Sequence, residues 1–141
     1  MAGGLAALPY RHVLTVPTAP SAVRMARETA EQALVEWGIS RHHPAMDPAL
    51  LILSELVTNC VRHAAEKSPQ TTVIYAASDD TLAFGVHDRH PFQPVLHGAS
   101  LGPGDSGLAT VVELTLALSG TAVVRKDADG GGKSIWITLP L

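Results

Sequence analysis

The chain has 141 residues, of which 46% are hydrophobic and 16% are charged, and its formal net charge is −3. These values suit a single compact domain and argue against a disordered chain. The mild acidity argues against a nucleic-acid-binding domain, which normally presents a basic face. No apolar run approaches the roughly 20 residues of a membrane span. One cysteine, Cys60, excludes an intrachain disulfide and fits a reducing compartment. We therefore expect a cytoplasmic protein that binds neither nucleic acid nor membrane directly.

Residues 1–9 lack the basic start of a signal peptide and are expected to form a flexible tail, which leaves residues 10–141 as a single domain. Hydrophobic periodicity predicts, in chain order, a strand at Tyr10–Val16, helices at Ser21–Trp37 and Asp47–Ala65, strands at Thr72–Ala77 and Thr81–Asp88, a helix at Gly107–Leu118, and strands at Thr121–Arg125 and Ser134–Leu139. This order predicts an α+β two-layer sandwich, with the helices on one face of a mixed, mostly antiparallel sheet.

Three residues are expected to mark helix ends. Gly38 and Gly120 follow the first and third predicted helices and should stop them. Asp47 should cap the second helix, with Pro48 at its first position. Between Arg89 and Ser106 the chain is irregular, and an aperiodic stretch of this length inside a compact domain indicates a functional lid.

The second helix carries a polar stripe on an otherwise apolar element. Glu55 and Asn59 are four residues apart and Arg62 follows three later, so the three side chains share one face. A helix that is apolar nearly all round is usually buried, and its polar groups then need partners. A magnesium-bound nucleotide phosphate would supply them. The alternative is a solvated polar stripe without function.

Asp88 ends a strand whose alternate residues are apolar. Leu82, Phe84 and Val86 share its parity, so Asp88 should lie at the edge of the core beneath the helices. A carboxylate only accepts hydrogen bonds, which suits it to reading an amino group. The alternative is a simple strand-ending aspartate in a turn.

The start of the third helix is rich in glycine. Gly104 and Gly107 precede Leu108 and would let backbone amides approach a phosphate at the helix N-terminus, although a simple loop has the same appearance. The sequence Gly132-Lys133-Ser134 lacks the glycine spacing and following helix of a P-loop, which is therefore rejected.

Two other types of site are disfavoured. His87, His90 and His97 could approach one another near the lid, but no paired cysteine or His-Glu-x-x-His motif supports zinc. Cys60 lies within an apolar helix and is expected to be a buried packing residue rather than a nucleophile.

Glu55, Asn59, Arg62, His63 and Ala64, in this spacing, resemble the N-box of the GHKL ATPase/kinase superfamily, which has the Bergerat fold. Within it the chain most resembles the small anti-sigma-factor serine/threonine kinases, over essentially the whole domain. The segment after the strand-ending aspartate departs from the common Asp-x-Gly-x-Gly pattern.

The resemblance implies ATP and Mg²⁺ as cofactors. It implies that Asn59 binds the magnesium that bridges the phosphates, that Glu55 activates a Ser/Thr hydroxyl or water, and that Asp88 accepts a hydrogen bond from the adenine amino group. Further nucleotide-binding residues implied by the resemblance are Arg62, His63, Gly104, Gly107, Leu108 and Thr138, the last helping to seat adenine.

The leading hypothesis from this resemblance is a kinase that transfers the ATP γ-phosphate to a Ser/Thr of an anti-sigma-factor antagonist and also sequesters a sigma factor, with a homodimer expected. A non-catalytic ATP/ADP-binding regulator, whose nucleotide-ordered lid controls partner binding, is the alternative. A protein-interaction domain that has lost nucleotide binding is a more distant third.

Overall fold

The computed structural model describes residues 8–90 and 106–141. Every predicted helix and strand is present in it. In chain order the elements are β1 (Tyr10–Pro17), α1 (Ser21–Glu36), α2 (Met46–His63), β2 (Gln70–Ala77), β3 (Thr81–Asp88), α3 (Ser106–Ala117), β4 (Thr121–Lys126) and β5 (Lys133–Pro140).

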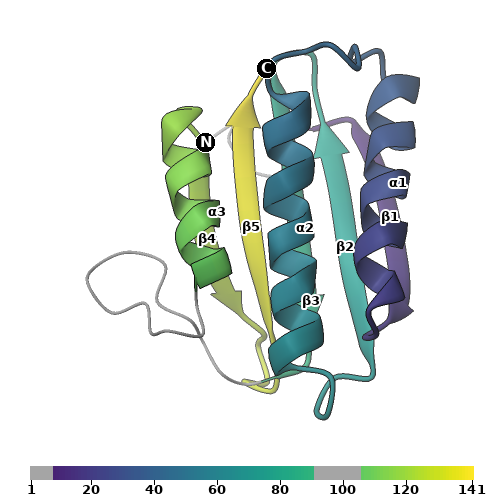
Figure 1. The fold of residues 1–141 in the computed structure, drawn as a ribbon, viewed down its shortest axis with the longest axis vertical. Helices are drawn as coiled ribbons and strands as arrows, with labels where there is room; N and C mark the ends of the chain where they lie inside the picture. The colour runs from purple at the N-terminus through teal and green to yellow at the C-terminus, as the bar shows by residue number, and fades with distance from the viewer. Residues whose placement is uncertain (1–7, 91–105) are drawn as a thin grey trace.

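The strands form one sheet in the order β1-β2-β3-β5-β4. Each neighbouring pair is antiparallel, so the sheet, which was expected to be mixed but mostly antiparallel, is antiparallel throughout the described residues. All three helices lie side by side on one face, with α2 in the middle (Figure 1). The predicted two-layer α+β sandwich is therefore confirmed. No helix in the described residues combines the length and apolarity needed to cross a bilayer.

The core lies between the helices and the sheet, and α2 supplies its centre. This helix packs against α1 on one side and α3 on the other, and it crosses above β3. Its side chains at three- and four-residue spacing are buried, which follows from the 3.6-residue period of the helix. Fully burying one such side chain stabilises the fold by about 1.5–3 kcal/mol. The most buried residues of the two layers are Ile52, Leu53, Leu56, Val57, Val73, Tyr75, Leu82, Ile137 and Leu139.

The predicted N-cap of α2 is wrong. The helix begins at Met46, Ala45 holds the N-cap position, and no side chain caps the helix. The preceding turn satisfies the free amides instead, because His43 accepts the Ala45 N–H on Nδ1 at 3.0 Å and the Met46 N–H on its carbonyl at 2.9 Å. Asp47 lies within the first turn, where its charge still favours the positive end of the helix dipole.

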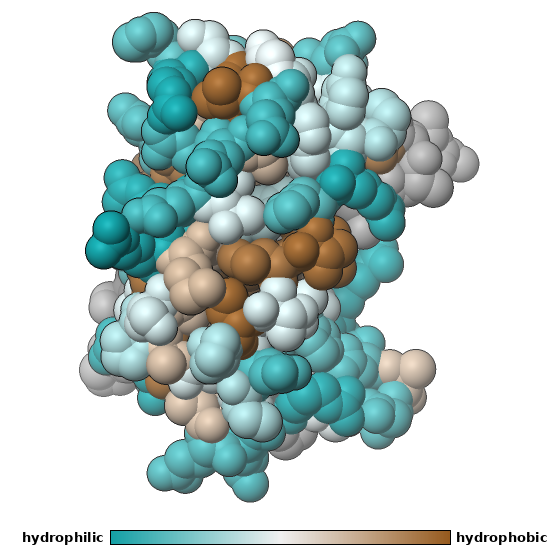
Figure 2. All heavy atoms as spheres, turned by 90° about the vertical axis from the view of Figure 1, so that its right-hand side faces the viewer, coloured by the Kyte–Doolittle hydropathy of each residue, from teal (hydrophilic) through white to brown (hydrophobic). Residues whose placement is uncertain are grey.

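One side of the molecule presents the edge strand β1 together with α1. Hydrophobic residues gather near the middle of this face, with polar residues above and below them (Figure 2). Four large hydrophobic side chains of these two elements are exposed: Tyr10, Val13, Met25 and Val35. The outer edge of β1 pairs with no other strand among the described residues.

The end of α3 is built from two residues rather than from Gly120 alone. Ser119 takes the left-handed conformation, with φ of 60°, and Gly120 follows it and donates its N–H to the Thr115 carbonyl at 2.8 Å. Gly120 is needed for space, because a Cβ there would lie 2.4 Å from the backbone oxygen of Thr138. Gly38 ends α1 as predicted, with φ of 88°.

We expect neighbouring substitutions in this turn to act in opposite directions. Gly120→Ala should lower the free energy of unfolding by about 1–3 kcal/mol, since the new methyl group overlaps a backbone atom of β5 that cannot move aside. Ser119→Gly should raise it by up to about 1 kcal/mol, because glycine adopts positive φ without steric cost. Urea unfolding of both variants measures the difference. A Gly120→Ala protein as stable as the unaltered chain would contradict the close approach.

Candidate functional site

The polar stripe of α2 lies on the side of the helix that faces away from the core. Leu51, Glu55, Asn59 and Arg62 follow one another along this side; Leu51 and Arg62 are exposed, and Glu55 and Asn59 are partly buried. His63 at the end of the helix is also exposed. The stripe is therefore only partly buried, because the apolar residues of α2 turn toward the sheet and leave the stripe on the outward side. Its polar groups are accessible to a ligand.

Asp88 lies beneath the helix layer, as its strand parity predicts. It is 2% exposed, at the end of β3. The Cys60 thiol donates a hydrogen bond to Asp88 Oδ2 at 3.2 Å. Because Cys60 directly follows Asn59 in α2, this contact lies one residue along the helix from the magnesium ligand expected from the N-box resemblance.

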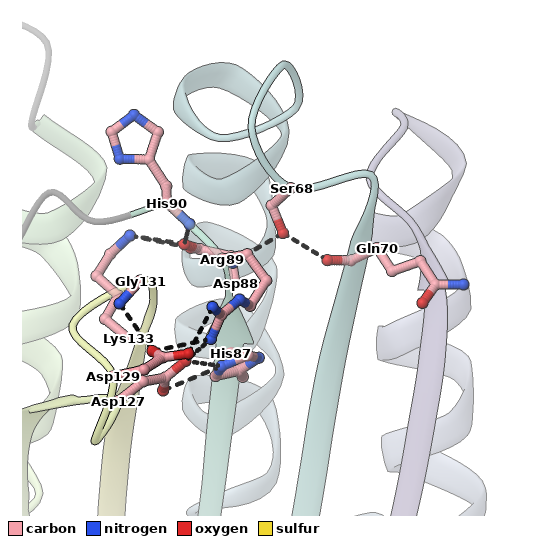
Figure 3. Close-up of polar contacts among 10 residues, drawn as sticks. All are labelled: Ser68, Gln70, His87, Asp88, Arg89, His90, Asp127, Asp129, Gly131 and Lys133. Atoms are coloured by element: carbon pink, nitrogen blue, oxygen red, sulfur yellow. Dashed lines mark hydrogen bonds and ion pairs between the residues drawn. The ribbon is translucent and has the colours of Figure 1, made fainter.

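Lys133, which was not predicted as a site residue, completes this arrangement. It is the residue of β5 that pairs with Asp88 of β3. Its ammonium lies 2.9 Å from Asp88 Oδ1 and 3.0 Å from Oδ2, and both side chains are buried (Figure 3). The His90 backbone N–H also donates to Oδ1, at 2.9 Å. Lys133 shares its parity with the buried residues of β5, and this was the signal in the sequence that could have identified it.

Ion pairs fix the turn that leads into Lys133. The Arg89 guanidinium contacts Asp127 at 2.6 Å and Asp129 at 2.9 Å, and His87 Nε2 lies 2.9 Å from the same Asp127 carboxylate (Figure 3). The Arg89 guanidinium lowers the pKa of the Asp129 carboxyl. These contacts join the β4–β5 turn to the end of β3, so the first residue of β5 is held in place.

The backbone around Asp88 is packed from both sides. On one side the Ser68 hydroxyl accepts the Arg89 N–H at 2.9 Å and donates to the Gln70 carbonyl at 2.7 Å. On the other side Gly132 approaches so closely that a Cβ there would lie 2.6 Å from the Asp88 carbonyl oxygen. The glycine before Lys133 therefore allows the two strand ends to meet.

The structure places Thr138 away from this site. Thr138 pairs with Ala83, whereas Asp88 pairs with Lys133 at the other end of the same two strands. Thr138 also has the opposite parity to Lys133, so it faces the side of the sheet that carries no helix. The prediction that Thr138 seats adenine does not fit this geometry.

The predicted glycine-rich phosphate loop is described only from its end. Gly104 lies outside the described residues, and α3 begins at Ser106 and includes Gly107 in its first turn. The Leu108 side chain is 1% exposed within the core, so only its backbone could face a ligand. His97 also lies outside the described residues, among which no group of three potential metal ligands occurs.

Cys60 is buried, as expected, and burial raises the pKa of its thiol above the ordinary 9.0, with the Asp88 carboxylate raising it further. The native thiol thus stays protonated and can donate to Asp88. Above about pH 9 the unfolded chain releases this proton and the native chain does not, so stability falls as pH rises.

Above about pH 9, ionisation of the Cys60 thiol in the unfolded chain should lower the free energy of unfolding by about 1.4 kcal/mol per pH unit. We expect Cys60→Ser to remove this contribution, because a serine hydroxyl does not ionise. Urea unfolding between pH 7 and 11 measures it. Burial likewise raises the pKa of Tyr75 above 10.0, so Tyr75→Phe is the control that acts only at the upper end of this range. An unchanged slope in Cys60→Ser would contradict the prediction.

Comparison with known proteins was made at the level of families and of solved structures. The family model described as a histidine kinase-like ATPase domain matches residues 16–139. A comparison with curated proteins found no match.

Two solved structures share the fold. The crystal structure of the RsbU and RsbW domains of Rv1364c from Mycobacterium tuberculosis superposes with a TM-score of 0.63 at 22% identity, covering 92% of this chain and 32% of that one. The histidine kinase domain of the blue-light activated histidine kinase EL346 from Erythrobacter litoralis has a TM-score of 0.51 at 24% identity, covering 67% and 46% of the two chains. This chain therefore spans less than half of either relative.

Proposed function

We infer that this chain, which belongs to the histidine kinase-like ATPase domain family, is an ATP-dependent serine/threonine protein kinase that phosphorylates an antagonist protein and sequesters a sigma factor. The family match and the fold confirm the predicted GHKL resemblance and support an ATP-binding regulator. One observation carries the proposal furthest. The Cys60–Asp88 contact joins the helix that carries the polar stripe to the buried carboxylate of β3, and this supports a nucleotide site that uses both elements.

The residues of the stripe have the chemistry for the phosphate end of such a site. The Asn59 carboxamide oxygen is a suitable ligand for Mg²⁺, a hard cation that prefers oxygen and would neutralise charge on the phosphates. Glu55, one helical turn away, would accept the proton of a Ser/Thr hydroxyl as it attacks. Arg62 and His63, exposed at the end of α2, would contact phosphate oxygens, as would the first amides of α3.

The partners are proposed by similarity. One structural relative contains RsbU and RsbW domains in one chain, and its likeness to this chain supports a partnership with an antagonist protein. The expected homodimer stays a prediction. The exposed hydrophobic side chains of α1 and β1 are a surface that such a dimer could cover.

Asn59→Ala should abolish most of the stabilisation by nucleotide. A ligand at one hundred times its dissociation constant adds about 2.7 kcal/mol to native stability, so Mg-ATP should raise the melting temperature of the unaltered protein. The variant should melt at a similar temperature without nucleotide and gain little from Mg-ATP. Thr58→Ala, at the adjacent position of α2, is the matched control and should respond normally. If neither ATP nor ADP with magnesium raises the melting temperature of the unaltered protein, the nucleotide-binding proposal is wrong.

Glu55→Gln should separate catalysis from binding. Loss of the proton acceptor should reduce transfer of labelled γ-phosphate to a candidate antagonist by about 100-fold or more, while the Mg-ATP melting shift is retained. Transfer at the unaltered rate would show that Glu55 is not the base.

The second candidate is a non-catalytic regulator that binds ATP or ADP. The feature favouring it is the segment after Asp88, which departs from the common Asp-x-Gly-x-Gly pattern. Nucleotide binding by the unaltered protein without phosphate transfer to any antagonist would establish it.

A further inference from the structure

We propose that Lys133 determines which base the nucleotide site selects. Near Asp88, where the base is expected to bind, Lys133 would present a hydrogen-bond donor in place of the acceptor that a free carboxylate offers. The site would then take 6-oxopurine nucleoside triphosphates at least as well as ATP. This inference rests on the proposed nucleotide binding and deepens it, because it names the class of base that the site accepts.

The first argument is the coordination of Asp88. A carboxylate offers about four acceptor sites on its two oxygens. Oδ1 accepts from Lys133 and from the His90 backbone N–H, and Oδ2 accepts from Lys133 and from the Cys60 thiol. All four sites are occupied by groups of the protein. An amino group on a purine would have to displace one of them.

The second argument is that Lys133 cannot easily be displaced. Its side chain is 6% exposed and that of Asp88 is 2% exposed, so separating them would leave two charges buried without partners. Strand pairing places the two residues opposite each other. The ion pairs of Arg89 with the β4–β5 turn hold the start of β5 against the end of β3. The pair is thus built into the sheet rather than formed by mobile surface side chains.

The third argument concerns what the pair can still offer to a ligand. An ammonium has three N–H donors and no acceptor. Within the described residues the Lys133 ammonium donates only to the two Asp88 oxygens, which leaves one donor. A 6-carbonyl oxygen can accept from it, whereas a 6-amino group meets a like donor. The polarity read at this position of the base is therefore reversed relative to a free aspartate.

Isothermal titration calorimetry with ATP and with inosine triphosphate, both with magnesium, tests the proposal. The unaltered protein should bind inosine triphosphate as tightly as ATP or more tightly. Lys133→Thr removes the ammonium and frees Asp88, so it should bind ATP about tenfold more tightly than inosine triphosphate. Lys126→Thr is the matched control, because it removes the same charge from the exposed residue that pairs with Lys133 in β4, and it should keep the unaltered preference.

The results separate this inference from the proposed function. A preference of the unaltered protein for ATP by tenfold or more would overturn the inference and leave ATP binding intact, and this arm needs no variant to fold. The same ratio of the two affinities in Lys133→Thr and the unaltered protein would also overturn it. If neither triphosphate binds to any of the proteins, nucleotide binding itself is wrong and the inference falls with it.

Discussion

The buried ion pair between Asp88 and Lys133 is the constraint around which one end of this protein is built. Removing a carboxylate and an ammonium from water costs several kcal/mol for each ion, and close pairing with further hydrogen bonds must offset that cost. The Cys60 thiol and the His90 amide supply the additional hydrogen bonds. The pair therefore ties three elements together at one point, because its members come from β3 and β5 and its third partner from α2.

That point is surrounded by contacts that leave the pair little freedom. The close approach of Gly132 to the Asp88 carbonyl lets the two strand ends meet, and the salt bridges of Arg89 fasten the turn that precedes Lys133. Removing any one of these contacts would change how much the Asp88–Lys133 pair contributes to stability, since residues that share hydrogen-bond partners couple in their effects on stability. The tight glycine turn is thus part of the site.

Strand parity and helix periodicity were enough to predict the fold and the position of Asp88. Three apolar residues in phase with Asp88 place it beneath the helices without any knowledge of its neighbours. Lys133 likewise shares its parity with the buried residues of β5, but that parity points to Asp88 only if β5 lies beside β3. That order is a property of the whole sheet and cannot be read from either strand alone. For Thr138 the family resemblance suggested a role in seating adenine. Its parity in β5 turns its side chain to the other face of the sheet, which does not fit that role.

Helix ends were harder to predict than helices, because several local groups compete for the same free amides. At the start of α2, His43 accepts the amides of Ala45 and Met46, and Asp47 lies inside the first turn rather than at the N-cap. At the end of α3, Ser119 takes the positive φ that glycine would normally take, and Gly120 is held by the need for space against β5. Sequence preferences identify the residues involved in such turns but not the division of roles among them.

The two ends of the proposed nucleotide site, near Asp88 and along the polar stripe of α2, differ in how many of their hydrogen-bonding groups are already paired within the protein. Around Asp88 every acceptor is engaged and the groups are buried, whereas Glu55, Asn59 and Arg62 lie on the outward side of α2. A base that binds near Asp88 gains little from replacing hydrogen bonds that the protein already makes there. Only a protein group with an unused donor can add to the binding energy of the base. Affinity for a nucleotide would then come mainly from the phosphates and their metal. Because the phosphates are common to all nucleoside triphosphates, the proposed site would distinguish bases chiefly through the one Lys133 donor that has no acceptor among residues 8–90 and 106–141.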